Sequence, residues 1–448
     1  MSFKDAYLSA MRRLPEGVRW AEANIKKTES TIVTAKDGAF DSAAVENADA
    51  SYVRAAITGA GMAYTQDLSA DPTALILQAA QNGMLSGEVA SGDALAADIL
   101  RVMPTLPPGE EAARLSEKAC CVTHLAQQAD VRVVSAICAI REDTHTAFVL
   151  NSRGTQTENV FRVYTCELDI AASENGQTVN TSALVTAPSL DALDITACVR
   201  EALSKAEEQF LPVVSVPAGS YPAVLDHSVM CNIFITAWQL FSAAKYEGGA
   251  SALCGLLGKE AASEAVTVID RPIHPACGYR YDCDDEATGE GDHTLIDRGV
   301  LTGLLHTRAT ALRAGAQLTG NAGRVALLTG SIPTALIPLP RVLTVEPGSR
   351  SRGELLAAMG DGLLIPFSFD IFHSINITSG DFSIPCRAIV VKDGRMIGQC
   401  RDLTMSGSLR DLLSSIEELG SDLCIQPFLL RSYCYGAPSA RISALRIG

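Results

Sequence analysis

One amphipathic helix that ends at a proline divides this chain more clearly than any other feature of its sequence. The apolar residues of the helix recur every three or four positions and therefore share one face. They are Ile195, Val199, Ala202, Leu203, Ala206 and Phe210. Pro212 cannot continue the helix, because proline lacks the backbone N–H and its ring clashes with the preceding turn. Since 448 residues are too many for one compact core, we expect two domains, 1–212 and 213–448, with a sub-boundary near 105–130.

Helix and strand signals are mixed on the N-terminal side of Pro212. Asp71-Pro72, a capping residue followed by proline, predicts the start of a helix that fades near Gly83. The other predicted elements are a helix over 3–14 and strands over 31–34, 53–58, 131–137 and 146–150. A charged turn at 141–143 is predicted between the last two strands.

The second domain is predicted to open with a strand over 213–216 and a helix from about 224 to 244. Beyond Ile273 short strands and turns prevail, with a proline-rich stretch over 333–347. We therefore predict an α+β fold. A mixed N-terminal α/β domain is followed by a β-rich C-terminal domain that carries one central helix.

The charge balance argues against nucleic-acid partners. Lys and Arg number 36 against 51 Asp and Glu, and the resulting net charge of −15 repels phosphate backbones. The 13 cysteines include no CxxC pair and suit a reducing compartment better than a disulfide framework. The first residues lack a signal-peptide core, and no run approaches the roughly 18 apolar residues that cross a bilayer. We expect a cytoplasmic protein without membrane or nucleic-acid partners.

Four segments of the C-terminal half carry a family resemblance. They are 283–286 continued by 295–301, 318–324, 376–382, and 407–413 continued by 420–422. In this order and spacing they resemble the TldD/PmbA family of metallopeptidases, and the last two lean toward its TldE/PmbA branch. The N-terminal half agrees more loosely, through Asp37-Gly38 and 67–69.

The resemblance implies that a metal site has been lost. Active members use a helix of pattern H-E-x-x-x-H, whose two histidines hold zinc with a later cysteine while the glutamate acts as general base. The equivalent positions here are His227, Ser228, Asn232 and Cys434. Serine does not accept a proton near neutral pH, and an amide is a poor zinc ligand. We therefore expect no catalytic residue, metal or cofactor in this chain, and zinc in a TldD-like partner.

A different metal site remains open at this point. His227 and Cys231 are four residues apart and share a helix face, so with Cys434 they could form a His-Cys-Cys zinc site. The alternative is that Cys231 packs as a small buried hydrophobe. The cluster His274, Cys277 and Cys283 has a spacing that matches no common zinc pattern.

Two further groups of family-motif residues are candidates for a peptide-binding cleft. The first group is Asp284, Asp285 and Glu286, whose carboxylates could equally bond backbone amides in a structural role. The second comprises Thr319, Gly320, Asn321, Arg324, Thr378 and Asp381. Thr319, Gly320 and Asn321 with Arg324 could cradle a substrate carboxylate, or form a tight turn in which Gly and Asn tolerate positive φ.

The resemblance implies a non-catalytic TldE/PmbA-like subunit in a heterodimer with a TldD-like catalytic subunit. Such a chain would help to enclose a cleft that binds extended peptides for processing of unfolded peptides or peptide precursors, with main-chain pairing along a strand edge. Two alternatives remain open. One is a self-sufficient homodimeric metallohydrolase with the His227/Cys231/Cys434 site, and the other is a non-proteolytic protein-binding module of the gyrase-modulator type.

Overall fold

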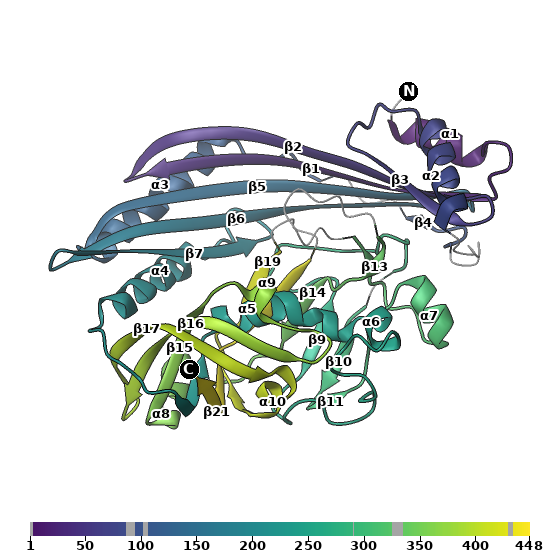
Figure 1. Ribbon diagram of the computed structural model, residues 1–448. Coiled ribbons are helices and arrows are strands. Elements are labelled where there is room, and N and C mark those ends of the chain that lie inside the picture. The colour runs from purple at the N-terminus through teal and green to yellow at the C-terminus, as the bar shows by residue number, and fades with distance from the viewer. Residues whose placement is uncertain (1–2, 87–94, 102–105, 290, 325–334, 429–432) are drawn as a thin grey trace.

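The computed structural model describes residues 3–86, 95–101, 106–289, 291–324, 335–428 and 433–448. A long, twisted sheet from the N-terminal half forms one layer, and the C-terminal half lies beneath it (Figure 1). The predicted α+β fold, dominated by strands, is confirmed. None of the described helices is long and apolar enough to cross a membrane.

The N-terminal half builds one seven-stranded sheet of order β3-β2-β1-β5-β6-β4, in which β7 also pairs with β6. The strands are β1 (Trp20–Lys36), β2 (Ala39–Ala56), β3 (Ala60–Thr65), β4 (Leu100–Arg101), β5 (Val133–Asn151), β6 (Gln156–Glu174) and β7 (Gln177–Ala187). The helices are α1 (Phe3–Arg12), α2 (Pro72–Ser86), α3 (Ala112–Ala129) and α4 (Ile195–Phe210). The first two helices cover one end of the sheet and the last two cover the other, each pair over its own hydrophobic core (Figure 1).

Two-residue turns set the register of this sheet. Asp37-Gly38 joins β1 to β2, and Asn175-Gly176 joins β6 to β7. All four residues have positive φ, between 50° and 86°, as the type I′ turn of a tight hairpin requires.

The charged turn predicted at 141–143 is wrong, because these residues lie inside the continuous strand β5. Asp143 is fully buried, and its carboxylate accepts hydrogen bonds from Arg141 Nε, at 2.7 Å, and from the Ser30 hydroxyl on β1. Because the charge is compensated within the sheet, the strand does not need to break there.

The C-terminal half holds two six-stranded sheets and a short two-stranded one. The first sheet contains, in spatial order, β11 (Val300–Leu301), β10 (His293–Asp297), β9 (Val268–Arg271), β14 (Val342–Val345), β20 (Cys434–Ala437) and β19 (Cys424–Pro427). The second contains β17 (Arg395–Ser408), β16 (Asp381–Lys392), β15 (Gly362–Ser368), β8 (Gly219–Leu225), β21 (Ala440–Ile447) and β18 (Ile416–Leu419). The short sheet pairs β12 (Ala322–Gly323) with β13 (Ile337–Pro338), and the peripheral helices are α7 (Arg308–Ala314), α8 (Arg352–Met359), α9 (Ile371–Ser374) and α10 (Leu409–Ser414).

The predicted helix from 224 to 244 is three shorter elements: α5 (His227–Ala237), the 3-10 helix η2 (Trp238–Phe241) and α6 (Ala243–Glu247). Helix α5 packs against β19 and β20 of one sheet and β15 of the other, so it is the central helix of this half. The strand predicted over 213–216 is wrong, since Val213 forms only an isolated bridge with Gln399.

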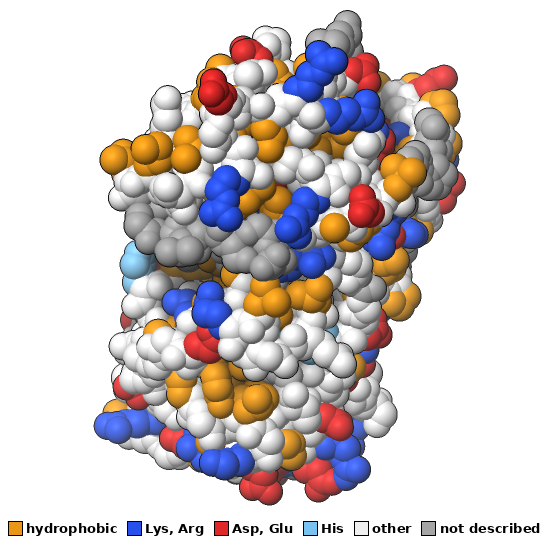
Figure 2. All heavy atoms as spheres, turned by 90° about the vertical axis from the view of Figure 1, so that its right-hand side faces the viewer, with side chains coloured by type: hydrophobic (Ala, Val, Ile, Leu, Met, Phe, Trp, Pro, Cys, Tyr) orange, Lys and Arg blue, Asp and Glu red, His pale blue; other side chains and the backbone are white. Residues whose placement is uncertain are grey.

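The division at Pro212 falls between α4 and β8 and remains our proposed domain boundary, as does the sub-boundary near 105–130. Residues 333–334 of the proline-rich stretch lie outside the described ranges. On the face shown in Figure 2, basic side chains are interspersed with acidic and hydrophobic ones.

Candidate functional site

A cleft of about 1190 Å³ lies between the two halves of the chain. Its upper wall comes from β5, β6, β7 and α4, and its lower wall from α5 and strands β15, β16 and β17. Ser228 and Asn232 are the residues of α5 that line it. The cleft therefore runs directly over the helix that the sequence singled out.

Helix α5 starts where β8 ends because Asp226 caps it. The Asp226 carboxylate accepts a hydrogen bond from the Ser228 backbone N–H at 3.0 Å, which satisfies a donor at the helix terminus. Most of the helix is apolar and buried, in keeping with its place between two sheets. Asp226 thus fixes which turn of the helix meets the cleft.

The two polar residues of α5 in the cleft are both bonded to β15. The Ser228 hydroxyl donates to the Pro366 carbonyl at 3.0 Å, and Asn232 Nδ2 donates to the Ser368 hydroxyl at 3.1 Å. A hydroxyl and an amide held in this way offer neither a general base nor a strong zinc ligand.

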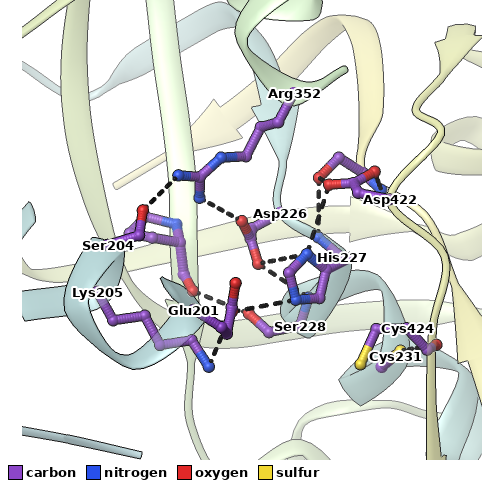
Figure 3. A network of polar contacts seen from close by, with 12 residues as sticks. Glu201, Ser204, Lys205, Asp226, His227, Ser228, Cys231, Arg352, Asp422 and Cys424 are labelled. Atoms are coloured by element: carbon purple, nitrogen blue, oxygen red, sulfur yellow. Dashed lines mark hydrogen bonds and ion pairs between the residues drawn. The ribbon is translucent and has the colours of Figure 1, made fainter. Parts of the chain in front are cut away.

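His227 is not among the cleft-lining residues and instead joins an ionic cluster (Figure 3). Its Nε2 lies 3.2 Å from Glu201 Oε1 on α4, and its Nδ1 lies 3.4 Å from Asp422 and 3.5 Å from Asp226. Arg352 completes the cluster, because its Nη1 donates to Asp226 at 2.6 Å. The imidazole is thus surrounded by three carboxylates.

These contacts keep His227 protonated. Burial opposes protonation, but the charge on Asp226 and the contacts with Asp422 and Glu201 outweigh it and raise the pKa of His227 well above its usual value. Burial alone would raise the pKa of Glu201 and of Asp422. The contacts with His227 outweigh burial, and the pKa of each carboxyl falls to about 2. The cluster is therefore a set of buried ion pairs at neutral pH.

Among the described residues, Glu201, Asp226 and His227 are the one group whose ligand atoms converge, all within 4.8 Å of one another. Zinc does not fit this set well. Both carboxylates already have cationic partners within the protein, since Asp226 accepts from Arg352 and Glu201 pairs with Lys205. The cluster is better suited to joining α4 to α5 than to catalysis.

The structure does not assemble the alternative site of His227, Cys231 and Cys434. Cys231 is fully buried, and its thiol donates to the carbonyls of Cys424 at 3.3 Å and Ala437 at 3.8 Å. The Cys434 thiol lies 3.9 Å from that of Cys277, and both are buried. The three residues therefore have separate partners, and the packing interpretation of Cys231 holds.

The His274, Cys277 and Cys283 cluster is also dispersed. His274 Nδ1 accepts from the Ala276 N–H at 3.1 Å, and the Cys283 thiol contacts the Thr157 hydroxyl at 3.6 Å. No metal site arises there within the described part of the chain.

Asp284 organises its own loop. Its Oδ1 accepts from the backbone N–H groups of Glu286 and Thr288 at 2.9 and 2.8 Å, and its Oδ2 accepts from that of Ala322 at 2.9 Å. Burial, together with the nearby charge of Glu286, raises the pKa of Asp284 to about 7. This residue has the structural role that the sequence left open.

Asp285 and Glu286 form an ionic seam with the N-terminal sheet. Asp285 Oδ2 lies 2.9 Å from Lys26 Nζ and 3.2 Å from Arg324 Nη1. Glu286 Oε1 lies 3.2 Å from Arg54 Nη2, which also pairs with Glu22 at 2.5 Å. We call Lys26, Arg54, Asp285 and Glu286 the ionic seam, because they join the two halves.

The other predicted cleft residues do not line the cleft. The Thr319 hydroxyl accepts from the His306 N–H at 2.9 Å, and Gly320 has φ +70°. Asn321 Nδ2 donates to Asp270 at 2.6 Å and to the Leu339 carbonyl at 3.1 Å. This segment is a turn, in which the Thr319 hydroxyl and the Asn321 amide nitrogen have partners within the protein, whereas the buried Asn321 Oδ1 has none among the described residues.

Arg324 stacks over the Tyr52 ring at 4.9 Å as well as pairing with Asp285, so it belongs with the seam. Thr378 lies in a turn where its N–H donates to Asn376 Oδ1 at 3.0 Å, and exposed Asp381 begins β16. These residues were candidates for a peptide-binding cleft, and they are not among the residues that line this one.

Sequence reasoning assigned no role to Glu201 or Arg352, and it quoted Asp422 only within the family segment 420–422, whereas the structure places all three around His227 and its cap. Glu201 lies on the predicted helix 195–210, but no local pattern links it to a residue of α5. Only the packing of α4 against the C-terminal half brings them together.

The cluster makes stability pH-dependent, and we expect His227→Gln to lower the free energy of unfolding by about 2 kcal/mol at neutral pH. The protonated imidazole stabilises the fold until the pH rises through its raised pKa, where that contribution is lost. The paired carboxylates stabilise it above pH 4.5, and their contribution is lost as the pH falls toward 2.

The loss of unfolding free energy caused by His227→Gln should therefore be largest between the lowered pKa values of the carboxylates and the raised pKa of His227. Chemical denaturation at several pH values measures this loss. His124→Gln is the matched control, since His124 is exposed on α3 and should cost less than about 0.5 kcal/mol. If the loss of unfolding free energy were the same at every pH, the ion pairs would not be what keeps His227 protonated.

A family model described as the PmbA/TldA metallopeptidase C-terminal domain matches residues 218–448. The fold and this match define a chain of the metallopeptidase type, whose cleft passes over helix α5. The chain belongs to the TldD/PmbA metallopeptidase family.

A relative called a metalloprotease, from Methanothermobacter thermautotrophicus, is 26% identical over 425 residues, which cover 92% of this chain and 90% of the relative. The fold resembles a Thermotoga maritima protein described as a candidate modulator of a DNA gyrase, with a TM-score of 0.81 and 22% identity over 100% of this chain and 99% of the other. It also resembles TldE from Thermococcus kodakarensis, with a TM-score of 0.79 and 18% identity over the whole of both chains.

Proposed function

We propose that this chain is a non-catalytic, TldE/PmbA-like subunit that forms part of a peptide-binding cleft in complex with a TldD-like zinc peptidase. One observation carries the proposal: the residues of α5 that line the cleft are Ser228 and Asn232, both held by β15. Peptide hydrolysis by zinc requires a metal-bound water and a group that takes its proton. In this chain the cleft over α5 supplies walls rather than reacting groups.

The His227 cluster supports the same proposal. The imidazole nitrogens of His227 contact Glu201, Asp226 and Asp422, and His227 is not among the residues that line the cleft. The self-sufficient metallohydrolase is disfavoured, because Cys231 and Cys434 lie with other partners. Strand β7, which among the described strands pairs only with β6 and lines the cleft through 177–182, is a candidate edge for main-chain pairing of a peptide.

We expect the purified chain to bind no stoichiometric zinc and to cleave no peptide alone. Co-expressed with a TldD-like partner from the same genome, it should elute as a complex with one zinc per pair and cleave an unfolded substrate such as casein. Metal analysis, size-exclusion chromatography and cleavage of a fluorogenic peptide measure these outcomes.

Ser228→Ala with Asn232→Ala provides the matched control. If α5 only shapes the cleft, this double variant should keep the activity of the complex within about threefold, which is less than 1 kcal/mol. Zinc-dependent cleavage by the chain alone, lost in that variant, would contradict the proposal.

A further inference from the structure

The lower wall of the cleft carries two arginines that protrude from adjacent strands. Cys386 pairs with Leu403 and Ala388 pairs with Cys400, so Arg387 on β16 faces a two-residue bulge of β17. The bulge contains Arg401 and Asp402, and Asp402 has φ +55°. Arg387 and Arg401 both line the cleft, whereas Asp402 does not. The bulge thus brings two like charges to the same surface.

Neither guanidinium has an ionic partner among the described residues. Arg387 Nη1 lies 3.5 Å from Gln209 Oε1, a long contact, and Arg401 Nε donates to Gln399 Oε1 at 3.2 Å. A guanidinium has five N–H donors, so most of these ten donors lack a protein acceptor.

The remaining charges of the cleft do not neutralise this pair. Glu208 lies 2.7 Å from Arg352, and Lys205 lies 3.1 Å from Glu201. Asp169, on β6 in the opposite wall, is exposed and forms no ion pair with either arginine among the described residues. Like charges on neighbouring strands repel, so an anion between them would be stabilised.

Two exposed aromatic rings hold one of the arginines in place. Phe367 and Phe369 are 45% and 39% exposed, and their rings meet edge to face at 4.6 Å. The Arg387 guanidinium lies 5.9 Å from the Phe367 ring centre and 5.6 Å from that of Phe369. Such stacking orders a guanidinium and offers an apolar surface beside it.

We propose that Arg387 and Arg401, with Phe367 and Phe369, form a carboxylate-binding subsite that anchors an extended peptide in the cleft. The carboxylate is either the C-terminus of the peptide or an Asp or Glu side chain, since both present the same two oxygens to a guanidinium. The subsite rests on the proposed peptide-binding function and adds to it a preference for anionic peptides. The aromatic pair contacts the residue next to the carboxylate.

The test measures binding of three fluorescein-labelled peptides to the full chain by fluorescence anisotropy. All three share one sequence of about ten residues: one has a single internal Glu and an amidated C-terminus, the second replaces Glu with Gln, and the third has Gln and a free C-terminal carboxylate. We expect at least one of the two carboxylate peptides to bind about tenfold more tightly than the neutral one. Whichever peptide gains identifies the source of the carboxylate.

The double variant Arg387→Gln/Arg401→Gln should abolish the difference, and Arg387→Lys/Arg401→Lys should keep part of it, because lysine retains the charge without the bidentate geometry. Arg395→Gln is the matched control, an exposed arginine of β17 that does not line the cleft. Unchanged circular dichroism of the variants establishes that they fold.

Equal affinity for all three peptides, or no binding of any of them, overturns the subsite. A carboxylate preference that survives the double Gln variant also overturns it. The proposed function fails separately, if a complex with a TldD-like partner does not cleave peptides whether or not they carry a carboxylate.

Discussion

Replacing Arg54 with alanine should lower the free energy of unfolding by about 4 kcal/mol at neutral pH. Arg54 lies between Glu22, at 2.5 Å, and Glu286, at 3.2 Å, and the side chains of both glutamates are 1% exposed. Without the guanidinium these two carboxylates remain buried near each other with no cation between them. The cost is mainly their unpaired charge.

The pH dependence of this deficit distinguishes lost charge from lost packing. Burial raises the pKa of Glu22, and Arg54 opposes that rise. In the variant the pKa of Glu22 should rise further, so a proton can neutralise the site at low pH. The deficit should therefore be small at a pH below the raised pKa of Glu22 and should grow as the pH rises above it.

Urea denaturation across that pH range measures the effect. Arg19→Ala is the control, because Arg19 is exposed beside the same sheet and should cost less than about 0.5 kcal/mol. Adding Glu22→Gln to Arg54→Ala should recover part of the loss. A deficit that is flat with pH and unaffected by Glu22→Gln would show that the seam acts through packing alone.

The second large effect is expected at Trp238, where alanine should cost about 4 kcal/mol. Trp238 is 2% exposed, and its Nε1 donates to the Tyr433 hydroxyl at 3.0 Å. Tyr433 in turn donates to the Ile235 carbonyl at 3.0 Å and stacks on Phe428 at 4.8 Å. Removing the indole would leave a cavity at the end of α5 and would deprive the buried Tyr433 hydroxyl of its donor, although that hydroxyl keeps its bond to the Ile235 carbonyl.

Trp238→Phe helps to separate these two contributions, since it keeps much of the aromatic volume but removes the N–H donor. We expect it to cost about 1.5 kcal/mol. Circular dichroism during chemical denaturation is the suitable measurement, because the chain has only 2 tryptophans and the substitution changes its fluorescence. Equal losses for the alanine and phenylalanine variants would mean that the hydrogen bond, not the packing, dominates.

Local sequence signals predicted the elements that local interactions determine. The helix over 195–210 is α4, and Asp71-Pro72 does begin α2, although α2 continues through Gly83 to Ser86. The proposed replacement of two metal-site positions could be inferred from the sequence because Ser228 and Asn232 lie within one helix. The family resemblance likewise depended on short contiguous segments.

Features that depend on distant partners could not be predicted. Strand β5 continues through 141–143 because Ser30, from another strand, bonds Asp143. His227 lies among carboxylates from α4 and from residue 422, a meeting that no spacing in the sequence reveals. Arg387 and Arg401 share a surface because of a bulge, whose position is set by how two strands pair.

The ionic seam also restricts how the two halves can diverge. Lys26 and Arg54 belong to one half, while the carboxylates that they neutralise, Asp285 and Glu286, belong to the other. A change of charge on either side would be tolerated only with a matching change across the seam. Exchanging one half for that of a distant relative would therefore succeed only where the relative carries the same arrangement of signs.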